Sequence, residues 1–545
     1  MDPQQDRPKP VVLLVLDGWG IGPANAGNAI TRSNIPNMRK YSVAFPHTQL
    51  TASGEAVGLP RGEDGNTETG HLNLGAGKIV YQDLPRINMS IADGSFYANP
   101  VFAQAFDHVK KNNSNLHLMG LIGSGGVHSN STHLYAIVNL AKQRGLDGNV
   151  YLHLFTDGRD SPPTAATSYI AQVQQQLKDN KVGKIATIMG RYFAMDRDRR
   201  WDRTQIAYDA LTLGSPACTQ DPIALLQERY NAGETDEFIK PISVCGPNEK
   251  PHTIADNDAV IFFNFRIDRP RQLTKAFVLP NFESGITSEG FDPYAVKYEK
   301  SHIKEKGPTQ TFQRQKILKN LFFVTMTEYE RGLPASVAFP PQAVEMPLGR
   351  VISEHGMKQL RMSETEKERF VTYYFNGLRE DAFTGEDHII IPSAKVPTYD
   401  QYPQMSAKEI TDTLIERINS GMYDFILVNY ANADMVGHTG NLTAAITACQ
   451  TIDECVGKVV QTVDSKNGVV LITADHGNVE EMINNETGEI DTEHSTYPVP
   501  LLVIGKTYQN QARMLPSGIL ADVAPTILSL LHIPKPDGMT GRALI

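Results

Sequence analysis

The chain has 545 residues, of which 41% are hydrophobic and 21% charged, and its formal net charge is −10. At roughly 100–200 residues per domain, this composition indicates a globular protein of about two to four domains. The negative charge excludes a surface built for nucleic acid or for anionic membrane, so an anionic ligand would need a local basic cluster.

The chain starts with a polar, proline-broken stretch, and the first apolar run, Val11–Leu16, is too short for a signal peptide or a membrane span. The four cysteines are few for this length and form no Cys-x-x-Cys pair, which is typical of a reducing compartment. We therefore expect a cytoplasmic protein.

The first predicted strand, Val11–Leu16, ends directly at Asp17. A glycine-rich loop then runs Gly65-Asn-Thr-Glu-Thr-Gly-His71 and places Thr67 at the start of a predicted helix. Backbone N–H groups in such a turn, together with a helix N-terminus, suit a phosphate group. Thr67 is thus a candidate nucleophile, and the alternative is a helix-capping threonine with Glu68 in the first turn.

From about residue 84, four apolar runs end in basic or amide-rich turns, with helical stretches such as Ala166–Leu177 between them. This alternation predicts a second parallel sheet. The runs and the charged residues that follow them are Leu116–Ile122 with His128, Val150–Phe155 with Arg159 and Asp160, Ile185–Met189 with Arg191 and Arg197, and Val260–Phe263 with Arg266 and Arg269. Arginine is the preferred partner of carboxylate and phosphate oxygens, so an anion pocket is favoured over a merely solvated charged face.

The polar, lysine-rich segment 285–320 predicts an exposed insertion without chemistry of its own. After the strand-like Leu321–Met326, the prolines of Phe339-Pro-Pro341 bar any helix. Residues Gly349–Gly356 and the amphipathic stretch Leu442–Val463 predict helices, and Val371–Phe375 and Ile389–Ile391 predict short strands.

The last third repeats the pattern of a strand followed by metal-ligand residue types. Phe425–Val428 precedes Asp434 and His438, Val469–Ile472 precedes Asp475 and His476, and His494 precedes the strand-like Leu501–Ile504. Any single carboxylate here would most simply be a turn or helix-cap residue. Ligands in open α/β sheets, however, lie outside the carboxyl ends of strands, and three Asp and three His, counting Asp17, could fill two cation sites suited to Mn²⁺ or Zn²⁺.

If Asp17 and Thr67 share a site with Asp434 to His494, the first and last thirds of the chain build one domain. We therefore predict an α/β protein with a discontinuous metal-binding domain formed by residues 1–81 and 342–545. Residues 82–341 would form a second α/β domain, inserted into the first, that binds the substrate.

Many specific motifs resemble the cofactor-independent phosphoglycerate mutases of the alkaline phosphatase superfamily. They cover nearly the whole chain in order and include Asp17-Gly-Trp-Gly, Gly-Asn-Thr-Glu-Thr-Gly-His71, Gly-Gly-Val-His128-Ser, Asp-Gly-Arg159-Asp, Arg191-Tyr-Phe-Ala-Met-Asp-Arg-Asp, Asn-Phe-Arg266-Ile-Asp-Arg and Thr-Ala-Asp475-His-Gly-Asn. The resemblance implies an isomerase that interconverts 3-phosphoglycerate and 2-phosphoglycerate in glycolysis and gluconeogenesis through a phosphoenzyme, without bisphosphoglycerate, and as a monomer.

The resemblance also implies roles for individual residues. One manganese ion would be held by Asp434, His438 and His494, and a second by Asp17, Asp475, His476 and the hydroxyl of Thr67, with Mg²⁺, Co²⁺ or Zn²⁺ as substitutes. Thr67, Asp160, Lys367 and Arg266 would be catalytic. The substrate would be bound by His128, Arg159, Asp160, Arg191, Arg197, Arg266, Arg269 and Lys367.

Position 67 departs from the family pattern, which usually has Ser in Gly-Asn-Ser-Glu. Threonine carries the same hydroxyl, but its β-branch restricts χ1 and adds a methyl group beside a metal. Two alternatives stay open at this point. The first is a metal-dependent phosphohydrolase that releases free phosphate, and the second is a metal-binding protein in which Thr67 is only structural.

Overall fold

The computed structural model describes residues 7–246, 249–285, 310–509, 511 and 513–545. The chain divides into two compact units, a first unit of Met1–Pro85 with Gln342–Ile545 and a second unit of Arg86–Pro341. The discontinuous α/β fold class is thereby confirmed. Within the described ranges, no helix is long and apolar enough to cross a membrane. The cytoplasmic location, the monomer and the absence of nucleic acid partners stay predictions.

The first unit is built on a mixed sheet, which has eight strands among the described residues. In spatial order these are β12 (Glu386–Ile391), β11 (Gln359–Glu364), β13 (Phe425–Tyr430), β1 (Val11–Leu16), β14 (Val469–Thr473), β15 (Val499–Ile504), β2 (His47–Thr51) and β16 (Gly518–Ile519). The strands from β12 to β14 run parallel, and β15 is antiparallel to both of its neighbours.

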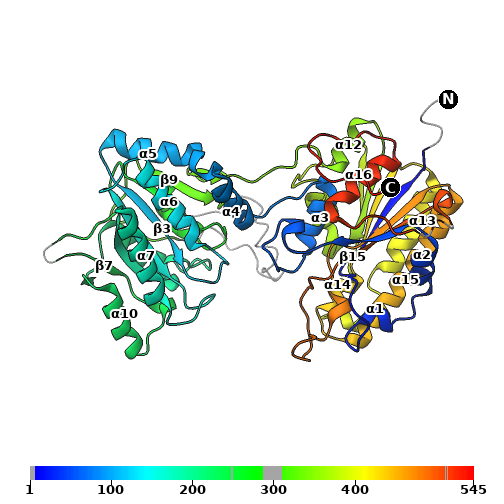
Figure 1. The fold of residues 1–545 in the computed structure, drawn as a ribbon, viewed down its shortest axis with the longest axis horizontal. Coiled ribbons are helices and arrows are strands. Elements are labelled where there is room, and N and C mark those ends of the chain that lie inside the picture. The colour runs from blue at the N-terminus through cyan, green and yellow to red at the C-terminus, as the bar shows by residue number, and fades with distance from the viewer. Residues whose placement is uncertain (1–6, 247–248, 286–309, 510, 512) are drawn as a thin grey trace. The chain divides into compact units, whose positions relative to one another are not determined.

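Strand β1, at the centre of this sheet, is apolar along its whole length, and helices pack around the sheet. All residues of β1, Val-Val-Leu-Leu-Val-Leu, are buried, as is usual for parallel strands. One group of helices packs around the long α15 (Leu442–Ser465), and it consists of α1 (Ala29–Arg32), α2 (Pro36–Ala44), α13 (Ala407–Ser420) and α14 (Asn432–Gly437). A separate group, α3 (Thr67–Ala76) with α12 (Leu348–Glu354) and α16 (Val523–Leu530), packs together elsewhere on the unit (Figure 1).

The second unit has its own sheet, again with eight strands in the part of the chain that is described. Their order is β10 (Ser336–Phe339), β9 (Phe322–Thr327), β8 (Ala259–Phe262), β3 (Leu116–Ile122), β4 (Val150–Thr156), β5 (Lys184–Gly190), β7 (Ile242–Val244) and β6 (Cys218–Thr219). All neighbours run parallel except β5 and β7. The surrounding helices include α5 (Pro100–Asn112), α6 (Ser131–Gln143), α7 (Ala166–Asn180) and α10 (Pro222–Asn231), which are labelled in Figure 1. Helices α9 (Trp201–Thr212) and α11 (Arg271–Val278) belong to the same unit.

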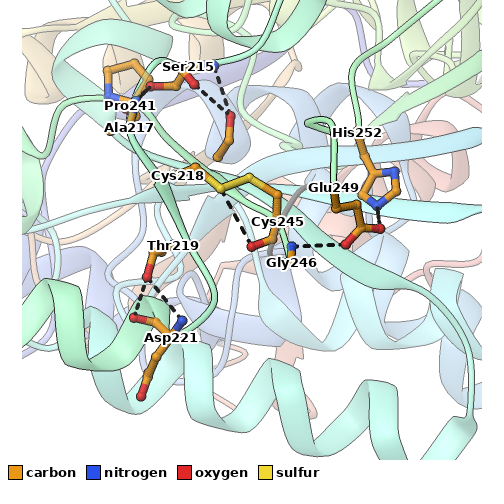
Figure 2. Close-up of a disulfide and its surroundings, with 11 residues drawn as sticks. Ser215, Ala217, Cys218, Thr219, Asp221, Pro241, Cys245, Gly246, Glu249 and His252 are labelled. Atoms are coloured by element: carbon orange, nitrogen blue, oxygen red, sulfur yellow. Dashed lines mark hydrogen bonds and ion pairs between the residues drawn. A yellow bond between two sulfur atoms is a disulfide. The ribbon is translucent and has the colours of Figure 1, made fainter.

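A disulfide joins the edge of this second sheet, which the sparse cysteines did not lead us to expect. Cys218 begins β6 and Cys245 directly follows β7, and their Cα atoms are 6.0 Å apart (Figure 2). The parallel pairing of β6 with β7 brings the two residues together. The other cysteines, Cys449 and Cys455, are free and buried in α15.

Three predictions about single segments need correction. Residues Phe370–Tyr374 form a π-helical turn instead of a strand, because aromatic and β-branched residues do not by themselves distinguish the two. The expected exposure of the segment 285–320 is wrong at Thr311, Phe312 and Arg314, which are buried, and residues 286–309 lie outside the described residues. The second sheet is mixed instead of purely parallel.

Candidate functional site

The predicted metal ligands of the first unit gather at the carboxyl edge of its sheet. Asp17 follows β1, Asp434 lies in α14 directly after β13, and Asp475 and His476 follow β14. These three strands are adjacent and parallel. His494 precedes its strand instead of following it, but β15 is antiparallel to β14, so the start of β15 lies at the same edge.

Asp434, His438 and His494 form the first cluster. The Nε2 atoms of both histidines lie 3.2 Å from Asp434 Oδ1 and 3.1 Å from each other. The Nδ1 atoms lie 2.7 Å and 2.9 Å from the carbonyl oxygens of Thr492 and Gly65. Hydrogen bonds to carbonyls place the protons on Nδ1, so both Nε2 lone pairs are free to coordinate a cation.

Asp17, Asp475, His476 and Thr67 form the second cluster. His476 Nε2 lies 3.0 Å from Thr67 Oγ1, 3.3 Å from Asp17 Oδ1 and 3.6 Å from Asp475 Oδ2. All four side chains are buried. Thr67 is the first residue of α3, and the side chain of Asn66 caps this helix by accepting from the Thr69 N–H. The N-cap role considered for Thr67 therefore belongs to Asn66.

Lys367 follows β11 and joins the two clusters. Its Nζ lies 2.8 Å from Asp17 Oδ1, 2.7 Å from Asp434 Oδ2 and 3.1 Å from Thr67 Oγ1. Burial alone would lower the pKa of this lysine, but the carboxylates of Asp17 and Asp434 outweigh burial and raise it. The ammonium group is therefore charged and lies beside the candidate nucleophile.

The donors in both clusters fit divalent cations. Three sets of ligand atoms each lie within 4.8 Å of one another, namely those of Asp434, His438 and His494, of Asp17, Asp434 and His476, and of Asp17, His71 and Asp475. Asp475 Oδ2 is buried, and none of the described residues donates a well-aligned hydrogen bond to it. His71 Nδ1 lies 3.1 Å away, close enough for an ionic contact. Mixed carboxylate and imidazole donors of this kind are typical of transition-metal sites.

The charges around Asp434 and Asp475 keep these two carboxylates ionised. Burial would raise the pKa of Asp434, but the charge of Lys367 and the neighbouring imidazoles of His438 and His494 outweigh burial and lower that pKa. Burial would also raise the pKa of Asp475, but the neighbouring His476 and His71 outweigh burial and lower that pKa. Ionised carboxylates are the form that binds a metal.

The basic residues of the second unit also gather at one edge. His128 follows β3, Arg159 and Asp160 follow β4, Arg191 and Arg197 follow β5, and Arg266 and Arg269 follow β8. The strands β8, β3, β4 and β5 are adjacent and parallel. The structure therefore brings all seven predicted residues of this unit to the carboxyl edge of its sheet.

Two carboxylates hold these side chains in place. Asp160 Oδ2 bonds Arg191 and lies 3.6 Å from His128 Nε2. Asp268 accepts from Arg197 at 2.8 Å and from Arg266 at 3.1 Å, and it lies 3.6 Å from His128 Nδ1.

The electrostatics of this second cluster are set by burial and by crowded positive charge. Burial lowers the pKa of His128 to about 3 against the opposing charge of Asp268, so the imidazole is neutral at physiological pH. Burial also lowers the pKa of Arg269 to about 10, helped by Arg191 and Arg197. At Asp160, burial is outweighed by the Arg191 hydrogen bond, and the pKa is lowered. The guanidinium groups that are now paired with ionised carboxylates could bind the oxygens of an anionic ligand instead.

Sequence reasoning missed residues that support the site. Asn429 lies within β13 and donates to Asp17 Oδ2 at 2.7 Å, while its Nδ2 lies 3.1 Å from His71 Nε2. In the second unit Asp157 bonds Arg191, Asp268 joins two arginines, and Glu237 bonds Arg159. Asp157 and Asp268 stand inside the quoted motifs, next to residues that were singled out. Glu237 has no such signal, because it comes from a different part of the chain.

Comparison with known proteins agrees with this arrangement. Residues 87–331 match the family model described as the BPG-independent PGAM N-terminus, and residues 292–533 match the sulfatase family model. The chain is 47% identical over 537 residues to the 2,3-bisphosphoglycerate-independent phosphoglycerate mutase of Moorella thermoacetica, covering 98% of both chains. It is 48% identical over 539 residues to such a mutase of Methanosarcina acetivorans, covering 98% of this chain and 97% of the relative.

A solved structure of Leishmania mexicana phosphoglycerate mutase, determined at low cobalt concentration, resembles this one with a TM-score of 0.57 and 28% identity. The similarity covers 100% of this chain and 98% of that protein. The family predicted from the motifs is confirmed by these relatives. The chain belongs to the family of 2,3-bisphosphoglycerate-independent phosphoglycerate mutases, within the alkaline phosphatase superfamily.

Proposed function

We propose that this protein interconverts 3-phosphoglycerate and 2-phosphoglycerate without bisphosphoglycerate, using two Mn²⁺ ions and a phosphothreonine at position 67. The observation that carries this proposal is the position of the Thr67 hydroxyl. It lies 3.0 Å from His476 Nε2 and 3.1 Å from Lys367 Nζ at the N-terminus of α3, in a chain whose relatives are named as mutases.

The metals would be held by the two clusters of the first unit. Asp434, His438 and His494 would hold one ion, and Asp17, Asp475, His476 and Thr67 the other. When bound, a pair of divalent cations lowers the pKa of a hydroxyl and neutralises phosphate charge. The identity of the metal as manganese and the number of ions, two, are both part of this proposal.

Thr67 is the nucleophile in this mechanism. Its Oγ1 attacks the phosphorus of phosphoglycerate and loses its proton, the bond from phosphorus to the substrate oxygen breaks, and that oxygen takes up a proton, so that glycerate and phosphothreonine are formed. Lys367 supplies a fixed positive charge for the phosphate oxygens, and Thr67 is the first residue of α3, where the helix dipole favours an anion. In the second half of the reaction the other glycerate hydroxyl attacks the phosphothreonine, and Thr67 regains its hydroxyl.

The residues of the second unit would bind the substrate. Arg159, Arg191, Arg197, Arg266 and Arg269 suit the carboxylate and phosphate oxygens, and the neutral His128 can donate or accept a hydrogen bond. Asp160 would take the proton from the glycerate hydroxyl that attacks. Its lowered pKa leaves it ionised at neutral pH, as a proton acceptor must be.

The test is incubation of the manganese-loaded protein with 3-phosphoglycerate alone, followed by phosphorus NMR. We expect 2-phosphoglycerate to form without inorganic phosphate. Accumulation of inorganic phosphate would instead support the phosphohydrolase, and no reaction at all would contradict catalysis by this chain.

Thr67→Val is the matched variant, because valine has the shape of threonine but lacks the hydroxyl. If Thr67 is the nucleophile, Thr67→Val should fold normally and lose at least about 10⁴-fold in kcat, whereas Thr67→Ser should stay active. A Thr67→Val protein that still converts the substrate would rule out the phosphothreonine.

A further inference from the structure

We propose that Glu480 is a positioning residue that ties together three loops which carry the proposed metal ligands. This proposal rests on the proposed function in one respect, namely that those ligands bind metal ions. Among the described residues, no hydrogen bond of the Glu480 carboxylate involves a proposed substrate-binding residue or the side chain of a proposed metal ligand, and the family resemblance implies no role for Glu480.

The carboxylate of Glu480 is buried in the short helical turn Val479–Glu481, where it accepts hydrogen bonds from its own loop and from two others. Oε2 accepts from the Gly20 N–H and from the Asn478 N–H, both at 2.9 Å. Oε1 accepts from the hydroxyl of Ser495.

Each of these donors lies close in sequence to a proposed ligand. Gly20 is three residues after Asp17, Asn478 is two residues after His476, and Ser495 directly follows His494. The side chain of Asn478 also reaches Asp434, with its Nδ2 at 3.3 Å from Oδ1. One carboxylate therefore fixes the backbone beside ligands of both clusters.

Two glycines make room for this carboxylate. A Cβ at Gly20 would lie 2.3 Å from the Glu480 carboxyl group, and a Cβ at Gly477 would lie 2.2 Å from its Oε1. Neither distance is tolerated by packed atoms, and neither glycine has a positive φ that would itself require glycine. The absence of a side chain at these positions is therefore explained by the close approach of Glu480.

A positioning role of Glu480 can be told apart from a purely stabilising role by measuring metal affinity. Residues that orient metal ligands through hydrogen bonds typically change metal affinity by about 10- to 100-fold when they are replaced. If Glu480 positions the loops, its loss should weaken metal binding in a protein that is still folded. Once the metal is saturating, the ligands are held by the ion and turnover should largely recover.

The experiment compares Glu480→Gln with the wild-type protein by calorimetric titration with Co²⁺ alone. The glutamine keeps the size of the side chain but loses the charge and one acceptor. Glu481→Gln is the matched control, since Glu481 is the next residue, is half-buried and accepts a hydrogen bond from the side chain of Asn485. We expect Glu480→Gln to bind Co²⁺ about 10- to 100-fold more weakly and Glu481→Gln to match the wild type.

The same variants are then assayed for mutase activity across Mn²⁺ concentrations. We expect the half-activating Mn²⁺ concentration of Glu480→Gln to rise by a similar factor, with kcat at saturating Mn²⁺ within a few-fold of wild type. Unchanged Co²⁺ affinity in folded Glu480→Gln would overturn the proposal. If Glu480→Gln does not fold, the same titration is made with Ser495→Ala, which removes one of the three donors to Glu480. Weaker Co²⁺ binding by Ser495→Ala would support the proposal, and unchanged binding would overturn it.

Failure of the proposed function has a different signature. In that case the wild-type protein itself would convert no 3-phosphoglycerate, while the difference in Co²⁺ affinity between Glu480→Gln and Glu481→Gln would still decide the role of Glu480.

Discussion

At the scale of single residues, the structure buries several groups whose protonation would be costly, and His133 gives the clearest case. This side chain of α6 is fully buried, its Nε2 lies 2.8 Å from Asn88 Oδ1, and its Nδ1 has no hydrogen-bond partner among the residues that are described. Since the Asn88 oxygen can only accept, Nε2 carries the proton and Nδ1 would have to accept a second one in a dry environment.

Burial lowers the pKa of His133 to about 4 from its ordinary 6.5. The unfolded chain therefore binds this proton more tightly, and stability is full above pH 6.5 and is lost as the pH falls toward 4. At pH 5 the loss is about 2 kcal/mol. We expect His133→Gln to flatten the pH dependence of urea unfolding between pH 6.5 and 4, and an unchanged slope would contradict this assignment.

At the scale of elements, helix α2 takes its N-terminal cap from another helix. Its own N-cap residue, Ile35, makes no side-chain hydrogen bond. Asp453 of α15 instead accepts from the Met38 N–H at 2.7 Å and from the Asn37 N–H at 3.2 Å. A buried carboxylate at this position satisfies two free N–H groups and complements the helix dipole.

We expect Asp453→Ala to lower the free energy of unfolding by about 2 kcal/mol and Asp453→Asn by about 1 kcal/mol, because asparagine keeps an acceptor but loses the charge. The exposed neighbour Glu454 supplies the control variant Glu454→Gln, which should be neutral within about 0.5 kcal/mol. Equal effects of Asp453→Ala and Glu454→Gln on urea unfolding would show that the cap contributes nothing.

The elements also show what the sequence can and cannot predict. Strands such as β1 and β3 were predicted residue for residue, because strands buried on both faces are continuous apolar runs. Strand β11 was missed because its buried residues include Gln359, Arg361 and Glu364, whose polarity hides a central strand. Their pairing, as in the contact of Arg361 with Glu386, depends on tertiary structure.

The site residues follow the same logic. Those that lie directly after apolar runs could be predicted, because the carboxyl ends of neighbouring parallel strands meet at one edge. Supporting residues such as Glu237 and Glu480 could not, since their roles arise only when distant loops meet.

At the scale of the whole molecule, the two units have separate hydrophobic cores. One core consists of residues from the first unit only and another of residues from the second unit only. All the proposed metal ligands belong to the first unit, while the Cys218–Cys245 disulfide belongs to the second. Two cores with separate stabilising features predict two unfolding transitions instead of one.

Each transition should respond to its own perturbation in calorimetry. Removing Mn²⁺ from about 100 times its Kd withdraws about 2.7 kcal/mol for each ion, which in a unit of this size lowers one Tm by about 4–5 °C per ion. Replacing both cysteines by serine opens a loop with a sequence separation of 27 and removes up to about 3.5 kcal/mol from the other transition.

The variant with both cysteines replaced by serine, measured with Mn²⁺, and the wild type, measured with EDTA, should therefore each show a lower Tm in a different transition. When both changes are combined the two shifts should add, since independent perturbations are additive. A single transition that both changes lower would mean that the two units unfold as one body. The stability of the metal site would then depend on the disulfide of the other unit, which separate cores give no reason to expect.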